Sequence, residues 1–514
     1  MKLQQVLEDL EYEVINGKVS PEEEITALVC DSRKLSPGCL FVCIPGANVD
    51  GHSFAPQAAR EGAAVIVTGR PMEELPELSG AIGDLEKEGK RVPTVLRVPD
   101  ERYALACLSA AWFGHPARKL TVIGITGTKG KTTTTYLVRS ILEGLGCRCG
   151  LIGTIEVIIG DTHIHAGNTT PESLLLQEYF ARMVEAGLDT VVMEVSSQAL
   201  MLHRTAGFLF DYGVFTNLEP DHIGPNEHSS FEEYLACKAK LFRQCKVGIA
   251  NRDDSHFAAI MEGHTCELTT FGIGAPASKS CDRDLYATDI RLTDTPGELG
   301  VSFTLSGLLE GEMHLPMPGK FSVYNALCAI AICAHVGSKK PGFGIPEIRE
   351  ALKNVHVPGR IEMVKVSDDF TLLIDYAHNA MALESLLGTL REYHPNRLVS
   401  VFGCGGNRAK SRRYEMGEVS GRMADFTIIT SDNPRFEEPL DIIADIRTGM
   451  EKTQGKYIEI PDRKEAIRYA IRNGRKGDII VLAGKGHEDY QEIKGVKYPM
   501  DERVLIREIL SEEA

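Results

Sequence analysis

The sequence lacks several features that would place it in a specialised class of protein. It has no run of 18 or more apolar residues, and its N-terminus, MKLQQVLEDLEYEV, has no basic region followed by an apolar one. These absences argue against a membrane span and a secretory signal, and they predict a cytoplasmic protein. The 13 cysteines are scattered without a paired C-x-x-C motif, so we expect reduced thiols rather than disulfides or a zinc site.

Basic residues are outnumbered, with 56 lysines and arginines against 72 aspartates and glutamates and a net charge of −16. This balance argues against general nucleic-acid binding, because most of the surface would repel a phosphate polymer. An anionic substrate would need a local basic pocket. The 514 residues, 43% hydrophobic and 25% charged, are typical of a globular protein with about three domains.

The most informative stretch is Leu120 to Thr135, LTVIGITGTKGKTTTT, in which an apolar strand pattern leads into a glycine turn and a helix. Gly127, Gly130, Lys131 and Thr132 form G-x-x-G-K-T, which is shorter than the usual phosphate-binding loop with four residues between its glycines. Backbone N–H groups can face phosphate oxygens, the lysine can reach the terminal phosphates and the threonine can bind Mg²⁺. We interpret this loop as an ATP site; the alternative is a glycine-rich turn with a surface lysine.

Two further predicted strands end in polar groups. Glu194 lies near the end of the run 189–195, and the strand 212–218 leads to Asp221 and His222. Because α/β folds bind ligands at the carboxyl ends of their strands, a carboxylate there can bind Mg²⁺ or orient water. A lone histidine is more often structural, but the expected position of His222 beside Glu194 favours a functional role.

The helix predicted over residues 231–242 carries a lysine on its apolar face. At 3.6 residues per turn that face contains Phe231, Tyr234, Leu235, Lys238, Leu241 and Phe242. One interpretation is a buried aliphatic stem whose ammonium group reaches water. The other is that burial lowers the pKa of Lys238, so that its free amine can be modified to a carbamate near the metal.

The remaining patterns predict α/β units on both sides of the phosphate-binding loop. Near the N-terminus we expect a helix over residues 3–10 and strands over 41–44 and 63–67, and we expect 71–92 to be a surface excursion. Towards the C-terminus, strands over 371–374, 398–403, 426–430 and 478–483 alternate with helical stretches, as in a doubly wound sheet.

Together these motifs resemble the Mur ligases, and among them the UDP-N-acetylmuramoyl-tripeptide synthetases. The resemblance is carried by residues 126–133, 194–197 and 216–218, by Asp221-His222, and by the spacing of Tyr234, Lys238 and Phe242. It extends through nearly the whole chain. It implies an α/β protein with three domains: a small α/β UDP-binding domain (1–118), a central ATPase-like parallel sheet with the P-loop (119–355), and a C-terminal Rossmann-like domain for the amino acid (356–514).

The resemblance also implies a role for individual residues. The catalytic set is Lys131, Glu194, His222 and Lys238, the last as a carbamylated N6-carboxylysine, and the Mg²⁺ ligands are Thr132, Glu194 and His222. The ATP-binding set is Gly127, Thr128, Lys129, Gly130, Lys131, Thr132, Thr133, Asn325, Arg360, Asp375, His378 and Asn379. The UDP-MurNAc-peptide set is Cys30, Ser32, Ala47, Asn48, Val49, Asn168, Thr169, Thr170, Ser196, Leu202 and Arg204. The diaminopimelate set is Arg408, Asp432, Asn433, Pro434, Arg435, Gly484 and Glu488.

The tetrapeptide Asp432 to Arg435, D-N-P-R, bears on which amino acid is used. It resembles the motif of relatives that add meso-diaminopimelate, whereas lysine-adding relatives usually lack the arginine. A guanidinium can hold the second carboxylate of diaminopimelate through two parallel hydrogen bonds, and it would repel the ammonium group of lysine. The alternative is a type I turn with a surface arginine.

The chain departs from the usual family pattern at a few positions. Lys129 replaces an asparagine, Cys30 a leucine, Leu202 a glutamine of some members, Cys237 an alanine, and Ala380-Met381 a Pro-Asp pair. These changes weaken individual expected contacts but remove no catalytic group.

The resemblance implies an ATP-dependent acid–amino-acid ligase of cytoplasmic peptidoglycan precursor synthesis. It would join meso-diaminopimelate to the D-Glu γ-carboxylate of UDP-MurNAc-L-Ala-D-Glu through an acyl phosphate, with Mg²⁺. We expect a monomer with these small-molecule substrates and with no nucleic-acid or membrane partner. The alternatives are a lysine-adding enzyme, a folylpolyglutamate-type ligase, and a nucleotide-dependent switch without ligase activity.

Overall fold

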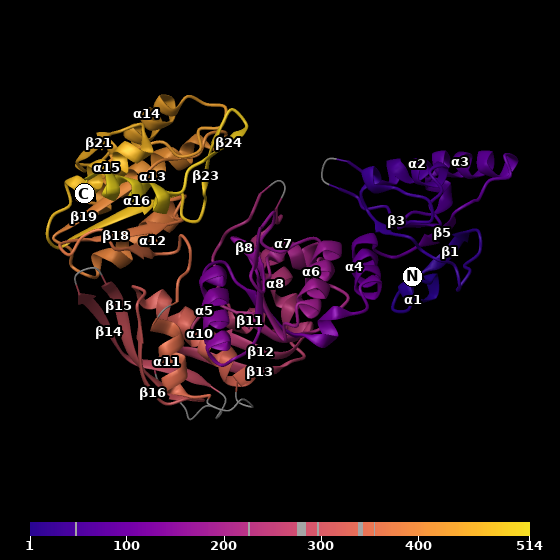
Figure 1. The fold of residues 1–514 in the computed structure, drawn as a ribbon, viewed down its shortest axis with the longest axis horizontal. Helices are drawn as coiled ribbons and strands as arrows, with labels where there is room; N and C mark the ends of the chain where they lie inside the picture. Colours follow the sequence, from indigo (N-terminus) through magenta and orange to yellow (C-terminus); the bar gives the residue numbers. More distant parts are fainter. Residues whose placement is uncertain are drawn as a thin grey trace. The chain divides into compact units, whose positions relative to one another are not determined.

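The computed structural model describes residues 1–46, 49–224, 227–274, 284–295, 298–337, 343–353 and 355–513. It forms two compact units, Met1–Lys131 with Gly146–Thr270, and Thr132–Leu145 with Phe271–Ala514. Parallel strands and helices alternate in both units, which confirms the predicted α/β class (Figure 1).

The N-terminal part of the first unit is a five-stranded sheet between two layers of helices. Its order is β1 (Glu13–Asn16), β5 (Thr94–Arg97), β4 (Val65–Thr68), β3 (Leu40–Val42) and β2 (Leu28–Val29), and only the β1–β5 pair is antiparallel. One face packs against α1 (Leu3–Val6) and α4 (Glu101–Trp112), and the other against α2 (Ala55–Arg60) and α3 (Pro76–Lys87).

Helix α3 corrects the expectation of a surface excursion over residues 71–92. Leu78, Ile82 and Leu85 recur at helical spacing and are buried against the sheet. The glycines and acidic residues between them obscured this short apolar face in the sequence.

The P-loop strand lies inside a parallel sheet of the first unit. The strand order is β12 (Cys245–Asn251), β11 (Phe210–Phe215), β6 (Thr121–Thr126), β10 (Thr190–Glu194) and β7 (Cys149–Ile152), all parallel, followed by the antiparallel strands β8 (Glu156–Ile159) and β9 (Thr162–His165). Side chains of α6 (Ser173–Glu185), α7 (Ser197–Met201) and α8 (Phe231–Ala239) form a buried core with this sheet. The carboxyl ends of β6, β10 and β11 therefore lie next to one another.

The second unit begins with the helix that follows the P-loop, α5 (Lys131–Gly144), and includes the long strands β14 (Leu285–Thr295) and β15 (Glu298–Gly307) with β16 (Gly311–Leu315). Helix α10 (Lys320–Gly337) contacts these three strands, and α11 (Ile345–Lys353) contacts β16. Among the described helices, α10 alone is long and apolar enough to cross a membrane by length and composition. However, 72% of its apolar window is buried inside the protein, as in a core helix.

The C-terminal sheet is doubly wound, as predicted. Its order is β17 (Glu362–Val364), β18 (Thr371–Asp375), β22 (Asp478–Ala483), β19 (Arg397–Phe402), β20 (Phe426–Ile429) and β21 (Tyr457–Glu459), and only β17 is antiparallel. One face packs against α12 (Ala380–Arg391), α13 (Lys410–Met423) and α14 (Pro439–Met450), and the other against α15 (Arg463–Arg472) and α16 (Glu502–Glu513). The hairpin β23 (Tyr490–Ile493) and β24 (Val496–Pro499) follows β22.

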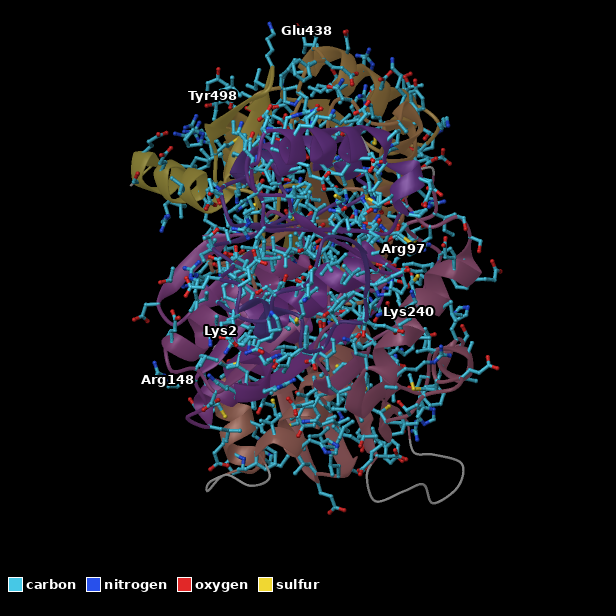
Figure 2. All side chains as sticks on the ribbon, turned by 90° about the vertical axis from the view of Figure 1, so that its right-hand side faces the viewer. Lys2, Arg97, Arg148, Lys240, Glu438 and Tyr498 are labelled. Carbon is cyan, nitrogen blue, oxygen red and sulfur yellow. The ribbon has the colours of Figure 1, made fainter. Side chains whose placement is uncertain are left out.

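Polar and apolar side chains are separated in the usual way. Charged side chains such as Lys2, Arg97 and Arg148 are exposed (Figure 2). The cysteines of the described segments are free thiols, and most of them are buried.

Candidate functional site

The glycine-rich loop after β6 wraps around the ammonium group of Lys131. Lys131 Nζ donates to the carbonyl oxygens of Gly127 at 2.8 Å and Thr128 at 3.1 Å. Gly127 and Gly130 have φ angles of 149° and 85°, which L side chains rarely adopt. The loop therefore has the backbone expected of a phosphate-binding turn at the start of a helix.

Thr216 and Asn217, which follow β11, fasten this loop from the neighbouring strand. The Asn217 side chain accepts a hydrogen bond from Lys129 N at 2.9 Å and donates to Lys129 O at 3.0 Å, while Thr216 Oγ1 donates to Lys129 O at 2.8 Å. No role for these two residues follows from the sequence pattern, although they belong to the T-N-L stretch that marks the family resemblance.

Lys238 lies under the same loop. Its side chain is 1% exposed, and its Nζ donates to Gly127 O at 2.9 Å and lies 4.5 Å from the centre of the Tyr234 ring. The Tyr234 hydroxyl is in turn 3.0 Å from Thr128 Oγ1. The predicted burial of Lys238 is thus confirmed, and a stem that carries its charge to water is excluded.

Burial lowers the pKa of Lys238 well below its ordinary value, and the nearby charge of Lys131 lowers it further. A lysine with a lowered pKa has a larger neutral fraction at pH 7. Only that neutral amine can act as a nucleophile, so the site supplies the chemistry that carbamate formation requires.

Glu194 is the last residue of β10, as expected, whereas His222 lies in the loop seven residues after the end of β11 rather than at the strand end. Glu194 pairs in register with Ile125 of β6, is 1% exposed, and accepts hydrogen bonds from Thr154 N at 2.8 Å and Thr154 Oγ1 at 3.1 Å. His222 is half-exposed, with its ring centre 6.1 Å from that of Tyr234 and its Nδ1 3.2 Å from Glu227. A carboxylate, an imidazole and the hydroxyl of Thr132 are donors that fit Mg²⁺ in chemical type.

Several residues of the expected muramoyl-peptide set surround Glu194. Thr170 Oγ1 donates to Glu194 O at 2.9 Å and accepts from Ser196 N at 3.0 Å. Thr169 Oγ1 lies 3.0 Å from Thr154 Oγ1, and Arg204 Nη1 donates to Thr170 O at 3.1 Å. The buried Nε of Arg204 has no hydrogen-bond partner in the described segments. Two other members are the exposed Asn168, which precedes Thr169, and the half-buried Leu202, which lies between Ser196 and Arg204 in the sequence.

The expected uridine-end residues are only partly placed. Ser32 opens a 3₁₀ turn capped by Asp31, whose pKa is lowered to about 2 by hydrogen bonds from Arg33. Cys30 is half-buried, and burial raises the pKa of its thiol. Val49 is 57% exposed. Ala47 and Asn48 lie outside the described residues.

The nucleotide-binding residues expected in the second unit fall into two places. Thr132 and Thr133 are buried in the first turn of α5, and Thr134 Oγ1 of the same helix lies 3.4 Å from Asn325 Oδ1 of α10. Asn379 caps α12 by accepting a hydrogen bond from Ala382 N at 2.8 Å, so the change to Ala380-Met381 leaves the cap intact.

Arg360, Asp375 and His378 surround Tyr376. The guanidinium carbon of Arg360 lies 4.8 Å from the Tyr376 ring centre, and His378 Nδ1 lies 2.9 Å from Tyr376 O. Asp375 accepts hydrogen bonds from Ile361 N and Ala377 N, but burial still raises its pKa. Burial also lowers the pKa of His378, which favours its neutral form.

Arg435 is held at the carboxyl edge of the C-terminal sheet in a left-handed conformation, with φ 53°. Its Nε donates to Glu492 Oε2 at 3.0 Å and its Nη1 to Gly406 O at 2.8 Å. A Cβ added to Gly405 would lie 3.2 Å from Arg435 Nη1 and 3.9 Å from Arg408 Cγ. The two arginines of the diaminopimelate set thus flank Gly405.

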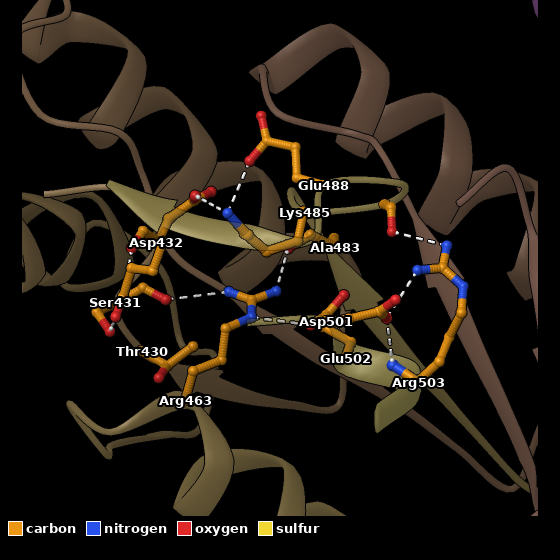
Figure 3. Close-up of polar contacts among 12 residues, drawn as sticks. Thr430, Ser431, Asp432, Arg463, Ala483, Lys485, Glu488, Asp501, Glu502 and Arg503 are labelled. Atoms are coloured by element: carbon orange, nitrogen blue, oxygen red, sulfur yellow. Dashed lines mark hydrogen bonds and ion pairs between the residues drawn. The ribbon is translucent and has the colours of Figure 1, made fainter. Parts of the chain in front are cut away.

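Acidic and amide side chains from the loops that follow β20 and β22 also belong to this region. Asn433 Nδ2 donates to Glu488 Oε2 at 2.8 Å, and Lys485 lies between Glu488 and Asp432 (Figure 3). A Cβ on Gly484, whose φ is 108°, would lie 3.0 Å from Asp432 Oδ2. Pro434 is buried, and its carbonyl lies against Gly406. The expected diaminopimelate residues therefore form one cluster, which also contains Lys485 and Glu492.

Sequence reasoning missed Lys485 and Glu492. The charged residues of the stretch G-K-G-H-E-D-Y-Q-E were a signal for Lys485, because a lysine between glycines at a strand end seldom serves packing alone. The pairing of Glu492 with Arg435 joins residues that are far apart in the chain and left no local signal.

Three family models match the chain in order. They are the "Mur ligase family, catalytic domain" at residues 24–112, the "Mur ligase middle domain" at 125–333, and the "Mur ligase, glutamate ligase domain" at 359–486.

Curated proteins match over the full length. The chain is 42% identical to the UDP-N-acetylmuramoyl-L-alanyl-D-glutamate--2,6-diaminopimelate ligase of Caldanaerobacter subterraneus subsp. tengcongensis, with 100% of this chain and 99% of that protein covered. It is 40% identical to ligase 1 of the same name from Clostridium acetobutylicum, with both chains fully covered. A solved structure of an enzyme of this name superposes with a TM-score of 0.70 at 28% identity, covering 100% of this chain and 99% of that one. These matches extend over the whole chain and share its three-domain architecture. The chain therefore belongs to the Mur ligase family.

Proposed function

We propose that this protein is an ATP-dependent ligase that joins meso-diaminopimelate to the D-Glu γ-carboxylate of UDP-MurNAc-L-Ala-D-Glu. The observation that carries the proposal is the cluster at the carboxyl edge of the C-terminal sheet, where Arg435 and Glu488 offer opposite charges. A diamino diacid needs both, a cation for its second carboxylate and an anion for an ammonium group. The names of the full-length relatives support the same substrate.

The first chemical step would take place at the P-loop. A γ-carboxylate oxygen of D-Glu attacks the γ-phosphorus of ATP, the bond to the β-phosphate oxygen breaks, and ADP leaves from an acyl phosphate. Lys131, already drawn into the loop by Gly127 and Thr128, would exchange those carbonyl contacts for phosphate oxygens. Bound Mg²⁺, held by Thr132, Glu194 and His222, would neutralise charge on the phosphoryl group.

Lys238 would act as its carbamate. Its neutral amine attacks CO₂, a nitrogen–carbon bond forms as one carbon–oxygen π bond opens, and a proton is released, so that the amine becomes a carbamate anion below the P-loop. Lys238 donates to Gly127 O and lies near Asp221, which places the new group in the part of the site where a metal ligand or its support is needed.

In the second step an amine of diaminopimelate attacks the acyl carbon, the carbon–oxygen bond to phosphate breaks, and the amine loses a proton. Arg408 and Arg435 would hold carboxylates, while Glu488 would hold an ammonium group and so orient the reacting amine. Thr169, Thr170, Ser196 and Arg204 would hold the muramoyl-peptide, and Ser32 with its neighbouring loop the uridine end.

We assign the three domains to residues 1–118 for the UDP-linked substrate, 119–355 for ATP and 356–514 for the amino acid. A protein with these substrates would act as a cytoplasmic monomer in peptidoglycan precursor synthesis. A lysine-adding enzyme is disfavoured because an ammonium group would face Arg435. A folylpolyglutamate-type ligase would not need the N-terminal α/β domain, and a nucleotide switch would not need an amino-acid site.

The proposal is tested by phosphate release from ATP with UDP-MurNAc-L-Ala-D-Glu present. Release should require meso-diaminopimelate and should be much slower with L-lysine or without an amino acid. Equal rates with lysine would overturn the assigned amino acid, and rates that ignore amino acids altogether would overturn the ligase assignment.

A further inference from the structure

Lys485 is a fully buried cation inside the proposed amino-acid site. Its side chain is 0% exposed, and its Nζ donates to Glu488 Oε2 at 2.7 Å, to Asn433 Oδ1 at 3.1 Å and to Tyr490 O. Asp432 Oδ1 lies 3.8 Å away (Figure 3). The three hydrogens of the ammonium group are therefore used within the protein, and Lys485 has none left for a substrate.

These contacts determine which oxygen of Glu488 is available. Glu488 Oε2 accepts from both Lys485 Nζ and Asn433 Nδ2, whereas no donor to Oε1 is found in the described part of the chain. Asn433 Oδ1 is likewise shared between Lys485 and the backbone N–H of Glu492. The lysine thus fixes the carboxylate in one orientation, with Oε1 remaining as the acceptor for an ammonium group.

Other charged and titratable groups face Lys485 and Glu488 from several elements. Asp432 follows β20, Tyr490 begins β23, and the buried Glu502 begins α16, where Arg463 is its ion-pair partner. Burial raises the pKa of Tyr376, which follows β18, to about 12, and the charges of Glu488 and Asp432 contribute to this rise. Glu502 thus has the buried Arg463 as its own partner, whereas removing Lys485 takes away the ammonium group that Asp432 and Glu488 share.

We propose that Lys485 is a positioning residue for amino-acid recognition, which holds the Glu488 carboxylate through its Oε2 and presents its Oε1 to an ammonium group of the incoming diamino acid. This inference rests on the proposed function. Without Lys485, Glu488 Oε2 keeps only the donor from Asn433, and Asn433 Oδ1 loses one of its two donors. The carboxylate is then no longer fixed with Oε1 towards the ammonium group.

The test compares Lys485→Met with wild type for diaminopimelate-dependent phosphate release, with kcat and KM determined separately. We expect KM for diaminopimelate to rise by about 10- to 100-fold, the loss of one charge-assisted contact, with little change in KM for ATP. The value of kcat at saturating diaminopimelate should change much less than KM, because Lys485 acts on recognition of the amino acid. A packing defect in the site would lower kcat as well.

Lys464→Met is the matched control, because Lys464 also lies between two carboxylates, Glu508 at 2.7 Å and Glu512 at 3.0 Å, but on the surface of α15 and α16. It should behave as wild type. Lys485→Gln removes the charge but keeps a hydrogen-bond donor, so it supplies the same comparison of KM with kcat if the methionine variant does not fold. The double variant Lys485→Met/Glu488→Gln should have a KM close to that of Glu488→Gln alone, because Lys485 acts through Glu488.

An unchanged KM for diaminopimelate, a fall in kcat as large as the rise in KM, or fully additive effects in the double variant would each overturn the role of Lys485. These outcomes differ from a failure of the proposed function, in which wild-type protein itself releases no phosphate in response to diaminopimelate.

Discussion

Replacing Arg435 by alanine removes the guanidinium that we assign to the second carboxylate of diaminopimelate. Of its five N–H groups, Nε–H is donated to Glu492 and one Nη1–H to Gly406 O, which leaves three on Nη1 and Nη2. Two of these can form parallel bonds to a carboxylate. At about 1.5–3 kcal/mol for each hydrogen bond to a charged group, their loss would cost about 3–6 kcal/mol, a factor of about 10² to 10⁴ in kcat/KM.

The lower part of this range is expected, because the Arg435 side chain is 23% exposed and water partly screens its charge. The assay is kcat/KM for diaminopimelate and for L-lysine, measured with Arg435→Ala and with Arg435→Lys, which keeps the charge but not the planar fork. Arg447→Ala is the control, since Arg447 also pairs with a carboxylate, Glu459 at 3.2 Å, but on the exposed side of α14. The reasoning is refuted if Arg435→Ala keeps its kcat/KM for diaminopimelate, or if it loses activity with both amino acids to the same degree.

Three further predictions concern single residues. Lys238→Met should fold with a stability loss of only about 1 kcal/mol in thermal unfolding, because one hydrogen bond to Gly127 is lost while an apolar chain fills the same space. Phosphate release should nevertheless fall sharply. Retained activity would contradict the role of the carbamate. Gly406→Ala would bring a Cβ to 1.9 Å from Pro434 O, so the loop must shift. KM for diaminopimelate should therefore rise while KM for ATP stays the same. An unchanged KM for diaminopimelate would contradict this prediction. Burial lowers the pKa of His228 in the folded state. The neutral ring therefore contributes to the stability of the folded protein above the unfolded-state pKa of about 6.5, and this contribution is lost as the pH falls through the folded-state pKa. The melting temperature of wild type should therefore fall more steeply below pH 6.5 than that of His228→Gln, and parallel curves would contradict this.

The parts of the fold that the sequence predicts are those set by local pattern. The apolar run before Gly127 and the one-sided helix around Lys238 have patterns that a single segment reveals. The strand forms as expected, and the helix expected over residues 231–242 forms as far as Ala239 and continues as the 3₁₀ turn Lys240–Arg243. The strand ends of the C-terminal sheet were also recognisable, since each apolar run stops at glycine or charged residues. Helix α3 was missed because its buried face, Leu78, Ala81, Ile82 and Leu85, is short and is interrupted by glycines and acidic residues.

The contacts that orient the site were not predictable from local pattern. Glu492 meets Arg435 through a strand contact between segments more than fifty residues apart, and Lys485 is neutralised by groups from two different loops. In both cases a residue's role depends on which other segment reaches it in the folded chain. Sequence motifs indicated which loops form the site, but not which side chains hold the ligand-binding groups in place.

The most direct test of the account is to follow the oxygen of the D-Glu γ-carboxylate. With that carboxylate labelled by a heavy oxygen isotope, an acyl phosphate requires one labelled oxygen to leave in each inorganic phosphate when diaminopimelate is added. Mass spectrometry of the released phosphate, together with detection of the amide product, measures this. The account predicts label in the phosphate in proportion to the product formed. Unlabelled phosphate, or phosphate released without an amide product, would contradict it.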